Sequence, residues 1–308
     1  MRLVAIVIVV AACHAPARVP TSRLADLDES YTDGDSRRAA SAQACPAIVN
    51  PRLWRIEKAG KTSHVFGTYH VGVGRDRLPA AVTDAFTSAR VIAFESIGDV
   101  AAPPDDEPTR PLSAELGIAA WKRLVALIGR ENAEAVEDQS ALIVSLLLTV
   151  MYVDLDAMLD NELEEEANRL GKRVVGLETD GTTVPLMRRW LNASTLRASL
   201  MESRGRRAMR KEALDGLADY CAGRDLEDHR ESGRTEREAQ KLEYDLLEGR
   251  NVAWMTPLEA LLAEGDAFIA VGAAHLRGPG SVIDLLERRG YTVTRVGSTG
   301  AVEASRQR

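Results

Sequence analysis

The chain has 308 residues, of which 45% are hydrophobic and 28% are charged, as in an ordinary globular protein with its own core. Its formal net charge of -7 argues against nucleic-acid binding, which favours a basic face. Aromatic residues make up only 5% of the chain, so Leu, Val, Ile and Ala must build most of the core.

The first residues predict an export signal. Arg2 precedes a short apolar run at 3–10, which cannot span a bilayer, and small residues follow. Cys13 stands directly after two alanines, where bacterial lipoproteins are cut and acylated. We predict a lipoprotein-type signal peptide over 1–12, lipidation of Cys13 and membrane attachment through that lipid alone. The expected location is the bacterial cell envelope, as an outer-membrane lipoprotein or in the periplasm. An ordinary signal peptide cut elsewhere is the alternative.

The segment 13–44 is rich in Ser, Asp, Arg and Ala, with almost no apolar periodicity, and predicts a flexible tether. A single domain is expected over 45–300, followed by a tail at 301–308. Cys45 and Cys221 would then lie in an oxidising compartment, where two cysteines more often pair than stay free. We predict a disulfide between them; two isolated buried thiols are the alternative.

Short apolar strands alternate with helices along this domain. Strands are expected at 53–57, 63–66, 90–95, 173–178, 267–271 and 291–296. Helices are expected from Leu78-Pro79 onward and at 113–128, 141–151, 155–170, 183–264 and 281–289. Strands separated by helices predict an α/β protein with a mixed or mainly parallel sheet flanked by helices. A large helical insertion occupies about 112–170 and 183–264.

Two of the strands end in the same pattern, Gly-x-x-His. Gly67 precedes His70, and Gly272 precedes His275. We expect a positive φ at each glycine, where the chain turns out of the strand. Two further strands end in carboxylates, Glu95 and Glu178. The carboxyl ends of parallel strands share the edge where α/β proteins bind ligands, so these side chains are expected to meet.

Two imidazoles and a carboxylate suit a divalent metal such as Mn, Co, Zn or Fe. We therefore predict a metal site formed by the two histidines and one of the two carboxylates. The second carboxylate can then take a proton from water bound to the metal. Each residue also has a structural alternative. A single Gly-x-x-His matches by chance, a carboxylate after a strand often caps a helix, and an arginine such as Arg250 often lies on a helix surface.

In their order, these segments resemble the TraB/GumN family, to which the TIKI metalloproteases belong. The resemblance runs from about 47 to 297. It rests on Leu53-Trp54, Gly67-Thr68-Tyr69-His70-Val71-Gly72, Leu78-Pro79, Phe94-Glu95, Met158-Leu159-Asp160, the run 171–179, Arg250-Asn251 and the run 271–278.

This resemblance implies a divalent-metal hydrolase, with cleavage of peptide or related amide bonds as the best-known activity. The expected partner is a peptide or small-molecule substrate. The paired family histidines fall on His70 and His275, and the acidic residue on Glu95. Further motif positions fall on Glu178, Arg250 and Asn251. With these positions assigned, we expect His70, Glu95 and His275 to hold the metal. Glu178 would move a proton, and Arg250 would stabilise a developing oxyanion.

The chain departs from the family where a Glu-Gln pair commonly follows the Leu-Glu-Thr segment, because it reads Asp180-Gly181-Thr182-Thr183 there. Substrate contacts near Glu178 are therefore expected to differ from those of the family.

Three other functions fit the same residues. The related ChaN-like lipoproteins are associated with haem, and histidines at a sheet edge can ligate iron, so a non-catalytic haem- or metal-binding lipoprotein is one alternative. The distantly similar erythromycin esterases suggest a hydrolase without metal, in which His70 and Glu95 act as acid and base. A structural protein with a decayed site is the third.

Overall fold

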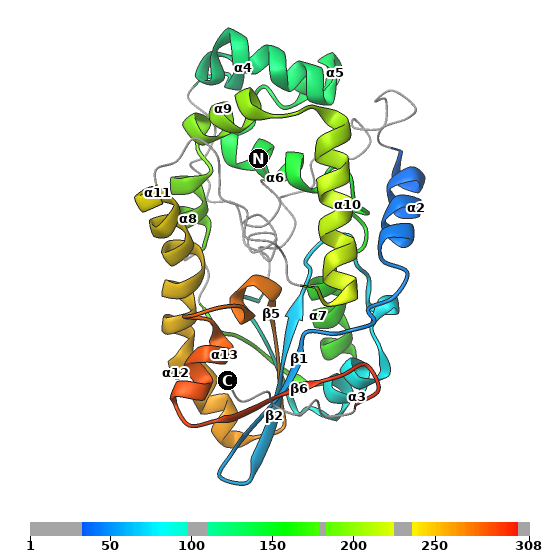
Figure 1. Cartoon of the computed structure of the whole chain (residues 1–308), viewed down its shortest axis with the longest axis vertical. Coiled ribbons are helices and arrows are strands. Elements are labelled where there is room, and N and C mark those ends of the chain that lie inside the picture. The colour runs from blue at the N-terminus through cyan, green and yellow to red at the C-terminus, as the bar shows by residue number, and fades with distance from the viewer. Residues whose placement is uncertain (1–32, 98–109, 179–182, 225–235, 301–308) are drawn as a thin grey trace.

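The computed structural model describes residues 33–97, 110–178, 183–224 and 236–300. A six-stranded sheet with the order β4-β3-β5-β2-β1-β6 lies in the lower half of the molecule as drawn in Figure 1. Strands β2, β5, β3 and β4 run parallel, whereas β1 is antiparallel to both β2 and β6. The predicted α/β fold with a mixed, mainly parallel sheet is therefore confirmed. The strands are β1 (Leu53–Lys58), β2 (Lys61–Thr68), β3 (Val91–Phe94), β4 (Arg173–Gly176), β5 (Ala267–Gly272) and β6 (Thr292–Val296).

Every residue of β3 and of β5 is buried, as expected of parallel strands covered on both faces. Strands β1 and β2 form a hairpin through Ala59 and Gly60, which both have positive φ, at 50° and 75°. Positive φ at both loop residues matches the right-handed twist of the two strands. The sheet therefore has a parallel centre and a hairpin toward one edge.

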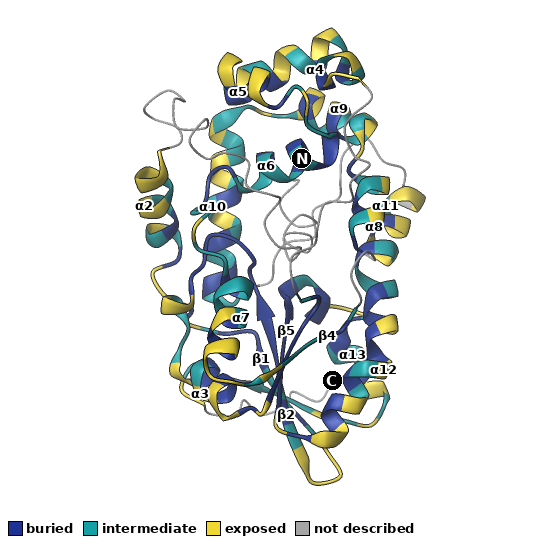
Figure 2. Ribbon diagram, turned by 180° about the vertical axis from the view of Figure 1, so that it is seen from behind, coloured by how far each residue is buried: buried dark blue, intermediate teal, exposed yellow. Residues whose placement is uncertain are grey.

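Side chains alternate between two cores on the two faces of the sheet. Phe66 and Phe268 face a core that includes α3 (Ala80–Ser88) and α7 (Leu159–Arg169). Their neighbours Val65 and Ile269 face the core formed with α12 (Gly249–Glu264) and α13 (Val282–Arg288). Figure 2 shows the central strands buried between these helices.

Further helices extend from the carboxyl edge of the sheet toward the end of the molecule opposite the β1–β2 hairpin (Figure 1). They fall within the two stretches predicted as a helical insertion, which β4 separates. They are α4 (Leu112–Ile128), α5 (Arg130–Ala135), α6 (Ala141–Val150), α8 (Thr183–Trp190), α9 (Ala193–Glu202), α10 (Arg206–Ala222) and α11 (Glu236–Glu243). A π-helical turn, η3 (Tyr244–Glu248), joins α11 to α12.

The predicted tether ends earlier than expected, because Gly34–Ala44 forms the helix α2. Asp33 caps this helix by accepting a hydrogen bond from the Ser36 amide at 2.6 Å. Ser41 on the helix accepts another from the Asp154 amide at 2.8 Å. Capping and tertiary contacts stabilise α2 without an apolar stripe, so hydrophobic periodicity could not reveal it. The predicted signal peptide, Cys13 and residues 14–32 lie outside the described residues.

Cys45 and Cys221 form the predicted disulfide, which links the end of α2 to the last turn of α10 across 176 positions of sequence. Within the described ranges, no helix combines the length and the apolar character needed to cross a bilayer.

Candidate functional site

The predicted site residues come together at the carboxyl edge of the sheet. Arg250 contacts Glu95, Glu178 and His275, and Asn251 contacts His275. His70 lies opposite Gly272, next to Glu95. His70, Glu95, Arg250, Asn251 and His275 are all buried, and the side chain of Glu178 is only 8% exposed.

The ends of four parallel strands place these side chains. Thr68, the last residue of β2, pairs with Gly272 of β5, so His70 and the 3-10 turn η4 (Ala273–Leu276) follow neighbouring strand ends. Glu95 directly follows β3, and Glu178 lies two residues beyond β4. The expectation that parallel strands deliver these groups to one edge is met.

The two motif glycines do not have the predicted positive φ. Gly272 has φ of -53°, and Gly67 is not among the described residues with positive φ. Both glycines instead allow close approach. A Cβ atom at Gly272 would lie 2.7 Å from His70 Nε2 and 3.1 Å from Glu95 Oε1. A Cβ atom at Gly67 would lie 3.1 Å from atoms of both Ala273 and Leu276. Each glycine thus makes room for the other motif.

Asp160 fixes the imidazole of His70. His70 Nδ1 lies 2.6 Å from Asp160 Oδ2, and Thr68 donates its hydroxyl proton to Asp160 Oδ1 at 2.8 Å. A carboxylate accepts hydrogen bonds, so Nδ1 carries the proton. His70 Nε2 is buried and has no hydrogen-bond partner in the described part of the chain. Burial lowers the pKa of His70, but Asp160 and then Glu95 outweigh burial and raise it above its ordinary value.

His275 is held as a neutral imidazole. Its Nδ1 lies 2.6 Å from Asn251 Oδ1, and Asn251 Nδ2 donates to the Gly280 carbonyl at 3.0 Å, which sets the orientation of the amide. Arg250 Nη1 lies 3.2 Å from His275 Nε2. Because arginine can only donate, Nε2 must offer a lone pair. Burial, Arg250 and His70 all lower the pKa of His275 well below its usual range.

Arg250 bridges the two glutamates. Its Nη2 lies 2.6 Å from Glu95 Oε2 and 2.8 Å from Glu178 Oε1, and its Nε lies 3.1 Å from Glu178 Oε2. The other oxygen of Glu95 accepts the Gly272 amide proton at 2.7 Å. Burial lowers the pKa of Arg250, but Glu95 and Glu178 more than compensate and raise it. The guanidinium therefore stays charged and compensates the two buried carboxylates.

Glu178 is surrounded by donors. Besides Arg250, Trp254 donates its indole proton to Glu178 Oε2 at 3.0 Å, and Thr183 donates its hydroxyl to Oε1. These contacts favour a fixed carboxylate that orients Arg250, and proton transfer by Glu178 stays a prediction. Thr183 belongs to the segment where the chain departs from the family pattern. Residues 180–182 of that segment lie outside the described residues.

Sequence reasoning missed the supporting residues Asp160, Thr183 and Trp254 as members of the site. Asp160 occurs in one of the quoted family motifs, but an acidic residue in the first turn of a helix is explained by the helix dipole alone. Trp254 lies one helical turn after Arg250, a spacing that equally predicts an ordinary buried face. Only the coordinates show which carboxylate and which indole reach the centre.

The described residues offer the types of ligand atom that suit a divalent metal, but these atoms are not arranged around a common point. His70 Nε2 is free and is backed by a carboxylate, which is how histidine ligands are commonly held. Among the described residues, no group of three His, Cys, Asp or Glu side chains is arranged to hold an ion. Arg250 engages the lone pair of His275 and one oxygen of Glu95. The guanidinium therefore occupies the lone pair through which His275 would bind an ion.

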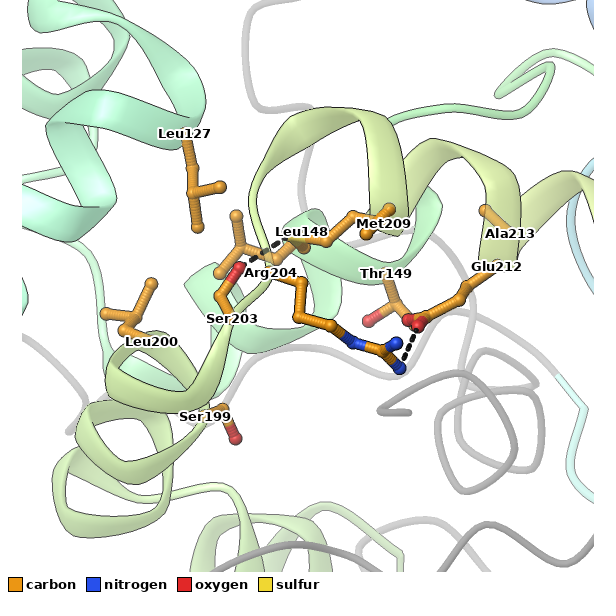
Figure 3. Close-up of a pocket in the computed structure, with 11 residues that line it drawn as sticks. Leu127, Leu148, Thr149, Ser199, Leu200, Ser203, Arg204, Met209, Glu212 and Ala213 are labelled. Atoms are coloured by element: carbon orange, nitrogen blue, oxygen red, sulfur yellow. Dashed lines mark hydrogen bonds and ion pairs between the residues drawn. The ribbon is translucent and has the colours of Figure 1, made fainter. Parts of the chain in front are cut away.

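A pocket elsewhere in the molecule is lined by residues of α4, α6, α9 and α10 (Figure 3). Most of its lining is apolar and includes Leu127, Leu148 and Leu200. Its charged side chains, Arg204 and Glu212, pair with each other at 3.2 Å. None of the predicted site residues lines this pocket, so we place the candidate chemistry at the sheet edge instead.

The protein is thus an α/β protein with a buried cluster of histidine, glutamate and arginine side chains at the edge of its sheet. Comparison with protein families makes the assignment specific, since the TraB/PrgY/gumN family matches residues 52–295. The chain belongs to this family, which confirms the resemblance seen in its motifs. Comparisons with curated proteins and with solved structures give no match.

The first prediction concerns Gly272. The Gly272→Ala variant should lose about 1–3 kcal/mol of unfolding free energy in urea denaturation, because the new methyl group overpacks the site. It would meet His70 Nε2 at 2.7 Å. Gly34→Ala is the matched control, since a Cβ at that position meets nothing within 4 Å. Equal unfolding midpoints for the two variants would contradict this reading of the glycine.

The second prediction concerns Arg250. Arg250→Ala leaves two carboxylates buried without their counter-charge and should cost about 3–5 kcal/mol of unfolding free energy. The control is Arg288→Ala, because Arg288 is 64% exposed in its ion pair with Asp284 and such pairs contribute little. If urea unfolding shows the same small loss for both variants, Arg250 does not hold the site together.

Proposed function

We propose that this protein is a hydrolase whose reaction centre is formed by His70, Glu95, Arg250 and His275, and that it uses a divalent metal such as Mn, Co, Zn or Fe. Peptide or related amide bonds are the substrate class that the family resemblance favours. The observation that supports the proposal most is the buried Nε2 atom of His70, which has no partner in the described part of the chain.

Leaving that nitrogen unpaired is unfavourable. A buried polar atom without a hydrogen bond costs about 1–3 kcal/mol, and such atoms are rare in native proteins. Asp160 holds the opposite nitrogen of the ring at 2.6 Å, so the imidazole cannot turn to satisfy Nε2 without losing that contact. An atom kept free at such cost is well suited to bind an ion or to accept a proton.

His70 Nε2, His275 Nε2 and Glu95 would hold the ion, with Asp160 and Asn251 fixing the two imidazoles from behind. An ion held there would supply Lewis acidity toward the substrate carbonyl. Binding of the ion would require Arg250 to leave His275 Nε2. Glu178 would keep the guanidinium beside the site, where it would stabilise negative charge that develops on the substrate.

A hydrolase without metal is the second candidate, and the contact between Asp160 and His70 specifically favours it. In that case His70 Nε2 would take a proton from the attacking water, and Asp160 would stabilise the resulting imidazolium. The raised pKa of His70, which Asp160 causes against the effect of burial, is consistent with such a base.

Metal analysis of the purified protein tests the first candidate. We expect near-stoichiometric divalent metal in the wild type and its loss in His70→Ala and in His275→Ala, because each removes an imidazole ligand. His64→Ala is the matched control, since His64 lies on β2 and takes no part in the cluster. Retention of metal by both site variants would remove these histidines from the ligand set.

Peptide turnover measured with and without exhaustive chelation separates the two candidates. Activity that disappears with the metal supports the first. Activity that survives chelation but is lost in Asp160→Asn supports the second, because the amide no longer stabilises a charged imidazole. A protein that turns over no peptide under either condition contradicts both.

We also propose that the protein is exported and carries a lipid on Cys13. The Cys45–Cys221 disulfide supports an oxidising compartment, since such bonds are rare in the cytosol. Membrane fractionation of the intact chain should find it in the membrane fraction, and Cys13→Ser should release it. An unchanged distribution would rule out the lipid anchor.

A further inference from the structure

Helix α10 contacts the first Gly-x-x-His motif through one buried tyrosine. Tyr220 donates its hydroxyl proton to the Gly67 carbonyl at 2.8 Å. Its ring packs against Tyr69, with 5.1 Å between the ring centres. Tyr69 directly precedes His70, so Tyr220 holds two points of the short segment that carries the histidine.

The last turn of α10 is joined to the segment before β1 by several bonds. The Cys45–Cys221 disulfide makes one connection, and the Val49 amide donates to the Cys221 carbonyl at 2.9 Å. The Arg52 side chain donates to the Arg224 carbonyl. The residue next to Tyr220 is thus covalently tied, and the position of the tyrosine relative to the sheet is fixed.

Gly67 is held from both sides by this arrangement. Its amide donates to the Arg52 carbonyl at 2.8 Å, while its carbonyl accepts from Tyr220. A tyrosine hydroxyl is protonated at neutral pH, and burial raises the pKa of Tyr220 further, so the hydroxyl is available as a donor. The peptide groups at the start of the motif therefore have little freedom to shift.

We propose that Tyr220 is a positioning residue for His70, and that α10, fixed by the Cys45–Cys221 disulfide, sets where His70 Nε2 lies. The space around that nitrogen is narrow, because a single added methyl group at Gly272 would lie 2.7 Å from it. A displacement near 1 Å at a reacting group can cost about 100-fold in rate. The expected loss of rate rests on the proposed hydrolase function. The link between Tyr220 and the position of His70 does not.

Hydrogen exchange of the intact protein tests the coupling without any substrate. Tyr220→Phe keeps the ring and removes only the hydroxyl, so the protein should fold. Amides in 66–72 should exchange about 10-fold faster than in the wild type, as expected when one buried hydrogen bond is lost. Ser145→Ala is the matched control, because it removes a buried hydroxyl that bonds within α6 to the Ala141 carbonyl.

A double variant, Cys45→Ala with Cys221→Ala, adds an independent measurement on the same segment. It should also speed exchange in 66–72, because α10 is no longer tied at its end. The proposal is overturned if Tyr220→Phe leaves 66–72 exchanging as in Ser145→Ala, or if it speeds exchange evenly over the whole chain.

Kinetics separates this proposal from the proposed function. If the wild type cleaves peptides, Tyr220→Phe should lower kcat by about 10- to 100-fold with little change in KM, since only the placement of the reacting atoms changes. An unchanged kcat would overturn positioning. A wild type without turnover, combined with faster exchange in 66–72, would overturn the hydrolase and leave the positioning of His70 standing.

Discussion

The bridge from Arg250 to Glu95 and Glu178 is the interaction on which the site depends. Three charged side chains, exposed by 8% or less, meet at the edge of the sheet. Without the guanidinium, both carboxylates would be buried charges, which is strongly unfavourable. Arg250 also sets the chemistry of His275, because its Nη1 proton requires a lone pair on that ring. One arginine on α12 thus contacts two carboxylates and an imidazole from three other elements.

The two Gly-x-x-His motifs are complementary. Gly67 leaves space for Ala273 and Leu276 of the second motif, and Gly272 leaves space for His70 of the first. The two imidazoles are nevertheless held differently. His70 has a carboxylate behind it and a free Nε2, whereas His275 has an amide behind it and an Nε2 that faces Arg250. The shared pattern therefore supplies two imidazoles with different environments to one centre.

Local patterns predict much of the fold and the four site residues that follow strand ends, whereas Arg250 and Asn251 were expected only from the family resemblance. The fully apolar runs of β3 and β5 identify covered parallel strands, and such strands deliver the residues after their ends to one edge. Contacts between distant residues could not be predicted in this way. Asp160 reaches His70 from α7 across 90 positions, and nothing in the acidic first turn of that helix indicates its target. The motif glycines were expected to provide turns, but close approach explains them, and only the packing of the two motifs reveals that.

The proposed site differs from an ordinary packed core in one respect, which is that His70 Nε2 carries no proton and is free to bind an ion. The most direct measurement is the nitrogen-15 spectrum of histidine-labelled protein in mildly alkaline solution, titrated with Zn²⁺. The proposed site requires both rings to carry their proton on Nδ1, and it requires the Nε2 signals of His70 and His275 to shift together as zinc is added. A proton on Nε2 of His70, together with Nε2 signals that zinc leaves in place, would contradict the central claim.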